Sequence, residues 1–496
     1  MTHQSITFEL ATLEDTNRLA QDLAFALQPG DLVFLAGTLG AGKTAFARAT
    51  LRALAGAELL EVPSPTFTLV QDYELGGVRA MHVDLYRLEE PEEIVELGLL
   101  DARADHLLLV EWSERAEGLL GEADIFVQIE ISGLNERRIT ISCAPPQSDN
   151  FNRSLQIRQA LRQMNWDTAN RSRLDDDGSA RRYERVSMDG NSAVLMDYHA
   201  FQQLDEAALT YRRAAHLSDD MEDFFAIGDE LRQRGIHTPK THGRSAQYAV
   251  ALLEDLGTEK ILDAEGAPIE ARYEVAIDAL AHLHGQGPPG PAVRHHFDWQ
   301  VFSAEVMLFI DWYLPDRQTM LSDPGRARYQ ALWPQLFDQL QQAETGWLIR
   351  DVHSPNILWQ QHADGLARCG FIDHQDALIG PTAYDVVSLC QDVRTVVPAA
   401  QETRLLDRYL AARRSQNPEF DLDAFTRAYR LCGVQRNLKI LGIFVRLHKR
   451  DNKPRYRRYL PAVADYVRRL CAAPELAELA DWLAAETDLF DREVQG

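Results

Sequence analysis

An eight-residue stretch near the start of the chain, Gly37–Thr44, constrains the fold of this sequence more than any other feature. It reads Gly-Thr-Leu-Gly-Ala-Gly-Lys-Thr and matches the pattern G-x-x-x-x-G-K-[ST]. The apolar run Leu32–Ala36 before it predicts a strand, and residues 45–54 after it predict a helix. In such a unit the glycine-rich backbone presents N–H groups to phosphate oxygens. The sequence therefore predicts an α/β domain with a phosphate-binding loop.

The loop pattern also assigns roles to its members. We expect Lys43 to reach the β- and γ-phosphates of ATP and the Thr44 hydroxyl to bind Mg²⁺. The remaining positions are expected to hold the nucleotide through their backbone; they are Gly37, Thr38, Leu39, Gly40, Ala41 and Gly42.

Three later segments carry side chains suited to the same site. Thr66 lies in a proline-flanked stretch typical of a switch loop, although a rigid turn explains the stretch equally simply. Asp84 ends a predicted strand and is expected to bind Mg²⁺, the alternative being a cap or an ion pair. Glu111 leaves the apolar strand 107–110 and is expected to orient water, and Trp112 beside it either packs on the nucleotide or fills the core.

Five motifs in this order resemble the bacterial TsaE family over residues 5–143. They are GTLGAGKT, SPTFTLV, HVDLYRL, ELG and VEWSER. The resemblance implies a small α/β ATPase that supports threonylcarbamoylation of adenosine 37 in tRNA by binding the TsaB–TsaD complex. It also implies that Lys43, Thr44, Thr66, Asp84, Glu111 and Trp112 serve ATP and Mg²⁺ in the roles given above.

Charge and composition limit the partners and the compartment. The net charge is −24, and more than half of it lies in the first 145 residues. Because nucleic-acid binding requires clustered cations, we expect tRNA to be served only indirectly, through protein partners. The five cysteines show no pairing pattern and predict reduced thiols. No segment approaches a membrane-spanning length, so we expect a soluble cytoplasmic protein without a membrane partner.

A proline-rich stretch divides the sequence into two modules. The segment Ala144–Asn150 reads APPQSDN and follows a predicted terminal strand. We expect a P-loop domain at 1–144, a short linker at 145–152 and a second domain at 153–496.

The second domain contains a kinase-like catalytic stretch, LIRDVHSPNILW, followed by GFIDHQD. An aspartate, an asparagine five residues later and an aspartate after an apolar strand form the arrangement that kinases use. We expect Asp351 to accept the proton of a substrate hydroxyl, and Asn356 and Asp373 to hold Mg²⁺ between phosphates. His353, two residues after Asp351, resembles small-molecule kinases of the aminoglycoside phosphotransferase type, because protein kinases have lysine there.

The stretch from Leu174 to Val186 suggests a small nucleotide-binding lobe. Its polar turn, with Ser179, either folds over phosphates or is a hairpin turn without a ligand. The strand 193–197 carries Met196 and lacks the lysine that protein kinases use against the phosphates. Arg181 or Arg182 is our hypothesis for the missing charge. The apolar strand near Glu254 runs into a turn suited to a hinge that binds adenine.

Eight motifs of this second domain together resemble the AmgK family over about residues 155–480. They are GSARRY, VLMD, LLEDLGT, LFIDWYL, IRDVHSPNILW, FIDHQDALIGPTAYD, QRNLKILGIF and KPRYRRYLP. The resemblance implies ATP-dependent kinases that form the 1-phosphates of N-acetylmuramate and N-acetylglucosamine in peptidoglycan recycling. Ile349 stands where the wider superfamily has the histidine of H-x-D.

The sequence also contains candidate residues for binding the sugar substrate. Glu305 and Asp311 lie on a predicted helix and could meet sugar hydroxyls together with His353, or they could form a solvated face. The fold expectation is an α/β P-loop NTPase domain followed by a bilobal α+β protein-kinase-like domain. Two functional alternatives stay open: a non-catalytic nucleotide-dependent binding module for the first domain, and an aminoglycoside or choline-type phosphotransferase for the second.

Overall fold

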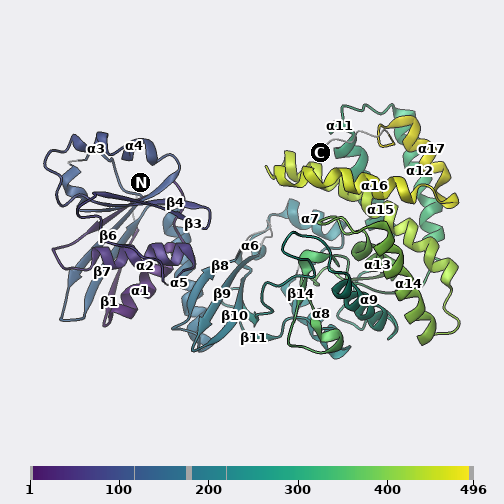
Figure 1. The fold of residues 1–496 in the computed structure, drawn as a ribbon, viewed down its shortest axis with the longest axis horizontal. Helices are drawn as coiled ribbons and strands as arrows, with labels where there is room; N and C mark the ends of the chain where they lie inside the picture. Colours follow the sequence, from purple (N-terminus) through teal and green to yellow (C-terminus); the bar gives the residue numbers. More distant parts are fainter. Residues whose placement is uncertain (1–3, 58, 117, 175–180, 219, 491–496) are drawn as a thin grey trace. The chain divides into compact units, whose positions relative to one another are not determined.

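A computed structural model describes residues 4–57, 59–116, 118–174, 181–218 and 220–490 of the chain (Figure 1). The chain forms two compact units. One consists of Met1–Gln203 with Thr241–Asp255, and the other of Leu204–Lys240 with Leu256–Gly496.

The first unit contains a seven-stranded mixed sheet, which we call the P-loop sheet. Its strand order is β1-β7-β6-β2-β5-β4-β3. The central strand β2 runs parallel to both neighbours, β5 and β6, whereas β1, β3 and β7 pair antiparallel. The bounds are β1 (Gln4–Leu10), β2 (Leu32–Ala36), β3 (Val70–Leu75), β4 (Val78–Asp84), β5 (His106–Glu111), β6 (Ile125–Ile131) and β7 (Arg137–Cys143).

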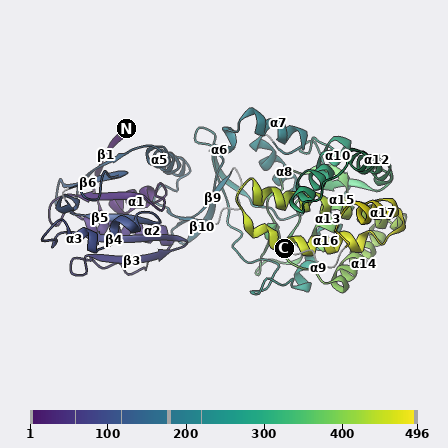
Figure 2. The same ribbon diagram turned by 90° about the horizontal axis from the view of Figure 1, so that it is seen from above.

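Helices α1 (Leu13–Ala24) and α2 (Lys43–Ala55) lie side by side against this sheet (Figure 2). A reciprocal capping box between Thr12 and Asp15 begins α1. Helix α2 follows the phosphate-binding loop, as the sequence predicts, and Gly56 ends it in a left-handed conformation. The short helices α3 (Glu93–Glu96) and α4 (Leu99–Ala102) precede β5. The strand–loop–helix prediction is therefore confirmed.

The expected linker is replaced by a helix from Gln147 onward. Helix α5 (Gln147–Gln163) packs Phe151 into the core of the P-loop sheet, and its later residues Ile157 and Leu161 into the core of a second sheet. Gln147 Nε2 donates to Asp31 Oδ1 at 2.7 Å. The polar residues of this segment suggest a loop, but apolar residues recur among them at helical spacing. Burial of these apolar residues in the cores of the two sheets favours the helix.

The second sheet of this unit is antiparallel, with five strands in the order β11-β12-β10-β9-β8. Its bounds are β8 (Asn170–Arg173), β9 (Arg182–Met188), β10 (Asn191–Asp197), β11 (Thr241–Ser245) and β12 (Val250–Glu254), and the short helix α6 (His199–Gln202) follows β10. One face of the sheet packs against α5 through Val186, Leu195 and Leu252. This is the small β-rich lobe that a kinase-like domain requires.

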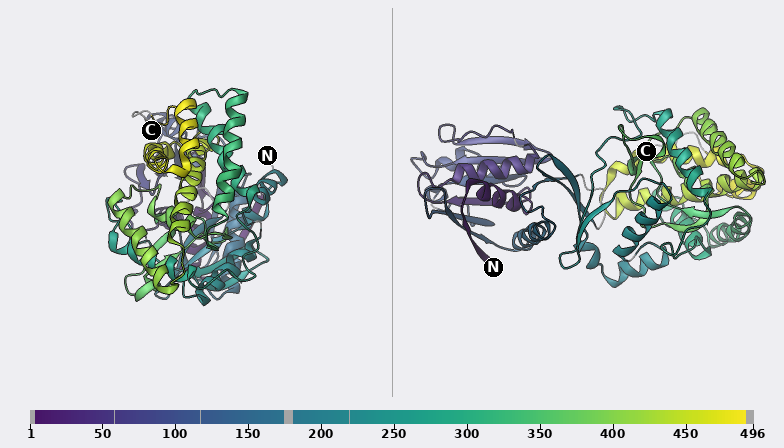
Figure 3. Two further views of the ribbon diagram at one scale, coloured as in Figure 1. Left: turned by 90° about the vertical axis from the view of Figure 1, so that its right-hand side faces the viewer. Right: turned by 90° about the horizontal axis from the view of Figure 1, so that it is seen from below.

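The second unit is mostly helical, and Figure 3 shows its helices from two further sides. Two short hairpin-like pairs carry the catalytic stretch: β13 (Thr345–Leu348) with β16 (Leu378–Pro381), and β14 (Ile357–Trp359) with β15 (Cys369–Phe371). The helices are α7 (Glu206–Ala214), α8 (Met221–Gln233), α9 (Glu270–His284), α10 (Trp299–Leu308), α11 (Leu314–Asp316), α12 (Asp323–Leu340), α13 (Ala383–Cys390), α14 (Ala399–Gln416), α15 (Leu422–Lys449), α16 (Leu460–Leu470) and α17 (Ala477–Glu486). Helix α15 runs through the core of this unit and is buried along most of its length.

Two absences bear on the sequence predictions. In the part of the chain that the structure describes, every helix is too short or too polar to cross a membrane. All five cysteines are buried, and none of them lies in a disulfide bond.

Candidate active sites

The phosphate-binding loop lies between the buried strand β2 and helix α2. At Gly37, with φ of +148°, an added Cβ would lie 2.4 Å from the carbonyl oxygen of Ile129, so only glycine fits. Arg137 Nε donates to the carbonyl of Ala41 at 2.8 Å and fixes the far side of the loop. Leu39, at the loop tip, is exposed. The loop is therefore held in shape by its neighbours while its tip stays open.

Lys43 lies inside this loop and not in solvent. Its Nζ donates to the carbonyls of Gly37 and Thr38 at 2.7 and 3.1 Å, and lies 3.7 Å from the centroid of the Trp112 ring. Burial lowers the pKa of the Lys43 ammonium, although Glu111 opposes that shift. Trp112 has a left-handed φ of +59°, which turns its ring toward Lys43. The structure thus brings Lys43 and Trp112 together, as the proposed nucleotide site requires.

The four oxygen-bearing side chains predicted for the magnesium, switch and water-orienting roles also lie together. Asp84 and Glu111 occupy paired positions at the ends of the parallel strands β4 and β5. Thr44 Oγ1 donates to Glu111 Oε2 at 3.1 Å, and Thr66 Oγ1 donates to Asp84 Oδ2 at 2.7 Å. Hydroxyl and carboxylate oxygens are ligands that Mg²⁺ prefers, so this donor set fits the ion.

His82 is a site residue that the sequence reasoning missed. Its Nε2 lies 2.8 Å from Glu111 Oε1, and both side chains are buried. The signal was present, because His82 precedes Asp84 by two residues on one strand and therefore shares its face. His82 orients the carboxylate that we expect to act on water.

In the second unit, two buried aspartates fasten the loop that carries Asp351. Asp385 accepts the backbone N–H groups of Ile349 and Arg350 at 2.6 and 2.8 Å. Asp392 accepts the N–H of Ser354 at 2.6 Å. The loop backbone is left-handed at Arg350, with φ of +82°, a conformation that a non-glycine residue keeps only when its surroundings enforce it.

Asn356 and Asp373 lie next to this loop. Asn356 Nδ2 donates to the carbonyl of Asp351 at 3.0 Å, and the N–H of Ile372 donates to the carbonyl of Asn356 at 3.0 Å. Gln375 Nε2 donates to Asp373 Oδ1 at 2.9 Å. Burial, followed by repulsion from Asp373, raises the pKa of Asp351 to about 6. The structure therefore brings the three predicted residues into one cluster whose oxygens fit Mg²⁺.

The predicted substrate residues behave differently from one another. Glu305 on α10 is buried and accepts Arg350 Nη2 at 2.6 Å, Lys439 Nζ at 2.7 Å and Gln435 Nε2 at 2.8 Å. Burial opposes ionisation of Glu305, yet Lys439 and Arg350 lower its pKa to about 2. The solvated-face alternative is therefore wrong for Glu305.

Asp311 lies in the π-helical turn Phe309–Tyr313, is exposed, and pairs with Arg326 at 2.7 Å. The structure does not bring Asp311 together with Glu305. The third predicted residue, His353, has a pKa that burial lowers to about 4, and its Nδ1 has no hydrogen-bond partner among the described residues.

The predicted small-lobe residues belong to the first unit. Met196 is buried in β10, Arg181 is buried just before β9, and Arg182 at the start of β9 is exposed. Glu254 ends β12. Ser179 lies outside the described residues.

Two family models match the chain. The model described as "Threonylcarbamoyl adenosine biosynthesis protein TsaE" matches residues 10–139, and "Phosphotransferase enzyme family" matches residues 171–424. An "N-acetylmuramate/N-acetylglucosamine kinase" of Caulobacter vibrioides is 32% identical over 347 residues, which are 65% of this chain and 92% of that protein. A TsaE protein of Rickettsia felis is 44% identical over 128 residues, which are 26% of this chain and 74% of that protein.

Solved structures also match. A Plasmodium vivax ethanolamine kinase aligns over 68% of this chain and 91% of its own, at 11% identity and a TM-score of 0.44. The phosphotransferase model matches half of the chain, and the TsaE protein of Rickettsia felis is matched over 74% of its own length. The chain therefore belongs to the phosphotransferase enzyme family and, through residues 10–139, to the TsaE family.

Proposed function

We propose that residues 1–144 form an ATPase that supports formation of N6-threonylcarbamoyladenosine in tRNA together with TsaB and TsaD. The observation that carries this proposal is the contact of Thr44 with Glu111, because it joins the end of the phosphate-binding loop to a carboxylate able to orient water. When bound, Mg²⁺ would neutralise phosphate charge, and Thr44 and Asp84 would hold it. The named TsaE relatives support the pathway, and the acidic charge of this part supports an indirect role toward tRNA.

The alternative, a binding module in which hydrolysis is incidental, is separated by one substitution. We expect E111Q to abolish ATP hydrolysis and to reduce tRNA modification in a reconstituted reaction with TsaB and TsaD. A variant that loses hydrolysis and keeps full modification would favour the binding module.

We propose that residues 153–496 form a kinase that transfers the γ-phosphate of ATP to the anomeric hydroxyl of N-acetylmuramate or N-acetylglucosamine. The observation that carries this proposal is the cluster of Asp351, Asn356 and Asp373 on a loop fastened by Asp385. Asp351 accepts the proton of the attacking hydroxyl, since its raised pKa makes it a stronger base than an ordinary carboxylate. Asn356 and Asp373 would hold Mg²⁺, which supplies positive charge to the phosphates when bound. The named kinase relatives support the substrate class.

A kinase for aminoglycosides or choline is the competing assignment. A panel of N-acetylmuramate, N-acetylglucosamine, aminoglycosides and choline, assayed with labelled ATP, separates the two. We expect turnover with the amino sugars only.

The two sites can be assayed separately in one chain. We expect D351N to abolish sugar-dependent ATP consumption and K43A to spare it. Because both reactions consume ATP and no described helix could span a membrane, we propose that both proceed in the cytoplasm.

A further inference from the structure

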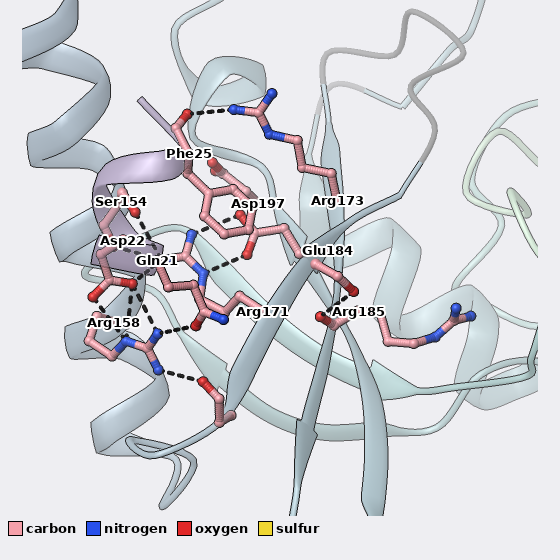
Figure 4. A network of polar contacts seen from close by, with 12 residues as sticks. Gln21, Asp22, Phe25, Ser154, Arg158, Arg171, Arg173, Glu184, Arg185 and Asp197 are labelled. Carbon is pink, nitrogen blue, oxygen red and sulfur yellow. Dashed lines mark hydrogen bonds and ion pairs between the residues drawn. The ribbon is translucent and has the colours of Figure 1, made fainter. Parts of the chain in front are cut away.

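A buried ion network joins helix α1, which packs on the P-loop sheet, to strands β8 and β9 of the five-stranded sheet (Figure 4). Arg171 on β8 has no exposed side-chain surface. Its Nη1 donates to Asp22 Oδ1 at 2.8 Å, and its Nε and Nη2 donate to the two oxygens of Glu184 at 2.7 and 2.9 Å. Its guanidinium lies 4.1 Å from the centroid of the Phe25 ring. One arginine of the kinase lobe is thus held by a carboxylate of the P-loop part and a carboxylate of its own sheet.

Asp22 binds a second arginine at the same point. Arg158 of α5 donates its Nε and Nη2 to the Asp22 carboxylate at 3.1 and 3.0 Å, and its Nη1 to the carbonyl of Ala169, next to β8, at 2.7 Å. Asp22 therefore pairs with two guanidinium groups that both reach the start of β8. We call Asp22, Arg158, Arg171 and Glu184 the interdomain brace.

Arg173, two positions after Arg171 on the same face of β8, repeats the attachment. Arg173 Nη2 donates to the carbonyls of Ala24 and Phe25, at 3.2 and 3.0 Å. These carbonyls lie at the C-terminal end of α1, where the helix dipole attracts a cation. Strand β8 is therefore fixed to α1 at two positions on one face.

The fixed strands lead into the part of the kinase lobe expected to meet ATP. Strand β8 ends at Arg173, and β9 begins at Arg182, directly after the buried Arg181. Glu184, the brace residue on β9, lies two positions from Arg182. Buried ion pairs with several hydrogen bonds fix geometry even when they add little net stability. The paired strands β8 and β9 are therefore held by a carboxylate, that of Asp22, which comes from outside the kinase module.

We propose that Asp22 is a positioning residue for the kinase: through Arg171 and Glu184 it holds the paired strands β8 and β9, and with them Arg181 and Arg182, in the position that ATP binding requires. This inference rests on the proposed kinase function. It makes the P-loop part a structural component of the kinase lobe, and not only its neighbour in sequence.

The test uses the full-length chain with K43A as background, so that an ATP analogue that resists hydrolysis reports on the kinase site. D22N keeps the size of the side chain and removes the charge that Arg158 and Arg171 share. We expect the analogue to bind D22N/K43A about 2- to 30-fold more weakly than K43A, the range for networks that couple two sites. In chains with an intact Lys43, the KM for ATP in sugar phosphorylation should rise by the same factor, with kcat and the KM for the sugar little changed. D22E, which keeps the charge, should restore part of the loss.

The matched control is E9Q, which breaks the exposed ion pair between Glu9 and Arg138 in the P-loop sheet. We expect E9Q to bind the analogue like its parent. If D22N destabilises the fold, R173M removes the second attachment and should weaken analogue binding in the same direction.

Two outcomes overturn the proposal: unchanged analogue affinity in folded D22N/K43A, or a loss in E9Q equal to that in D22N. Weakened analogue binding without any sugar-dependent turnover in the parent chain would instead contradict the sugar-kinase assignment and leave the role of Asp22 standing.

Discussion

The Nε2 atom of His82 lies 2.8 Å from the Oε1 atom of Glu111, at the buried ends of the adjacent strands β4 and β5. The other oxygen of Glu111 accepts the hydroxyl of Thr44. One carboxylate is thus held between a histidine and a residue of the phosphate-binding loop. Both contacts restrict its rotamer, which is what a group that orients water requires.

We predict that H82A lowers the rate of ATP hydrolysis by the P-loop part about 10- to 100-fold, the usual loss when the partner of a metal-site or catalytic carboxylate is removed. The measurement is sugar-independent phosphate release. The control is H106A, because His106 begins the same β5 strand that Glu111 ends and bonds Asp105 instead. Equal rates in H82A and the parent would show that Glu111 needs no support.

For Glu305 we predict a loss of stability. E305Q leaves Arg350 and Lys439 buried without their shared counter-charge, so the free energy of unfolding should fall by about 3–5 kcal/mol in urea titrations. E270Q, which breaks the exposed pair of Glu270 with Arg404, should leave it unchanged. A small effect of E305Q would mean that water enters and solvates the two cations.

The lowered pKa of Glu305 also predicts how the stability of the fold changes with pH. Because its pKa is lowered from 4.5 to about 2, Glu305 contributes stability that is fully present above pH 4.5 and is lost as the pH falls toward 2. Acid unfolding of E305Q should therefore lose part of the pH dependence that the parent shows in that window.

The raised pKa of Asp351 predicts how the rate of sugar phosphorylation depends on pH. Since its pKa is raised to about 6, the base form disappears below that pH, and kcat/KM for sugar phosphorylation should fall about tenfold per pH unit there. His353 cannot account for an inflection near pH 6, because burial lowers its pKa to about 4. An inflection near pH 4 in the measured profile would contradict the role of Asp351 or its raised pKa.

Arg181 and Arg182 should differ in their effect on ATP. Arg182 shares a strand face with the brace residue Glu184, while Arg181 directly precedes β9 and is buried. We predict that R181A raises the KM for ATP more than R182A does. Unchanged KM values in both variants would refute a phosphate-binding role for this pair.

Local pattern was sufficient wherever chemistry and secondary structure come from neighbouring residues. The strand–loop–helix unit at Gly37–Thr44 and the stretch from Asp351 to Asn356 are short motifs that residue types within a few positions identify, although the distant Asp385 fastens the second one. The clustering of Asp84 with Glu111 also followed, since the ends of parallel strands meet at one edge of a sheet.

From the sequence alone it follows that this chain joins a TsaE-family module to a phosphotransferase module, and the motifs predict which side chains in each would meet the nucleotide. Three features are visible only in the folded chain: Glu305 is a buried counter-ion, residues 147–152 are helical, and Asp22 lies against Arg171, a residue 149 positions away. The physical reason is that burial and charge pairing at such separations depend on how finished elements pack. The sequence of a single helix or strand does not specify which other element will pack against it.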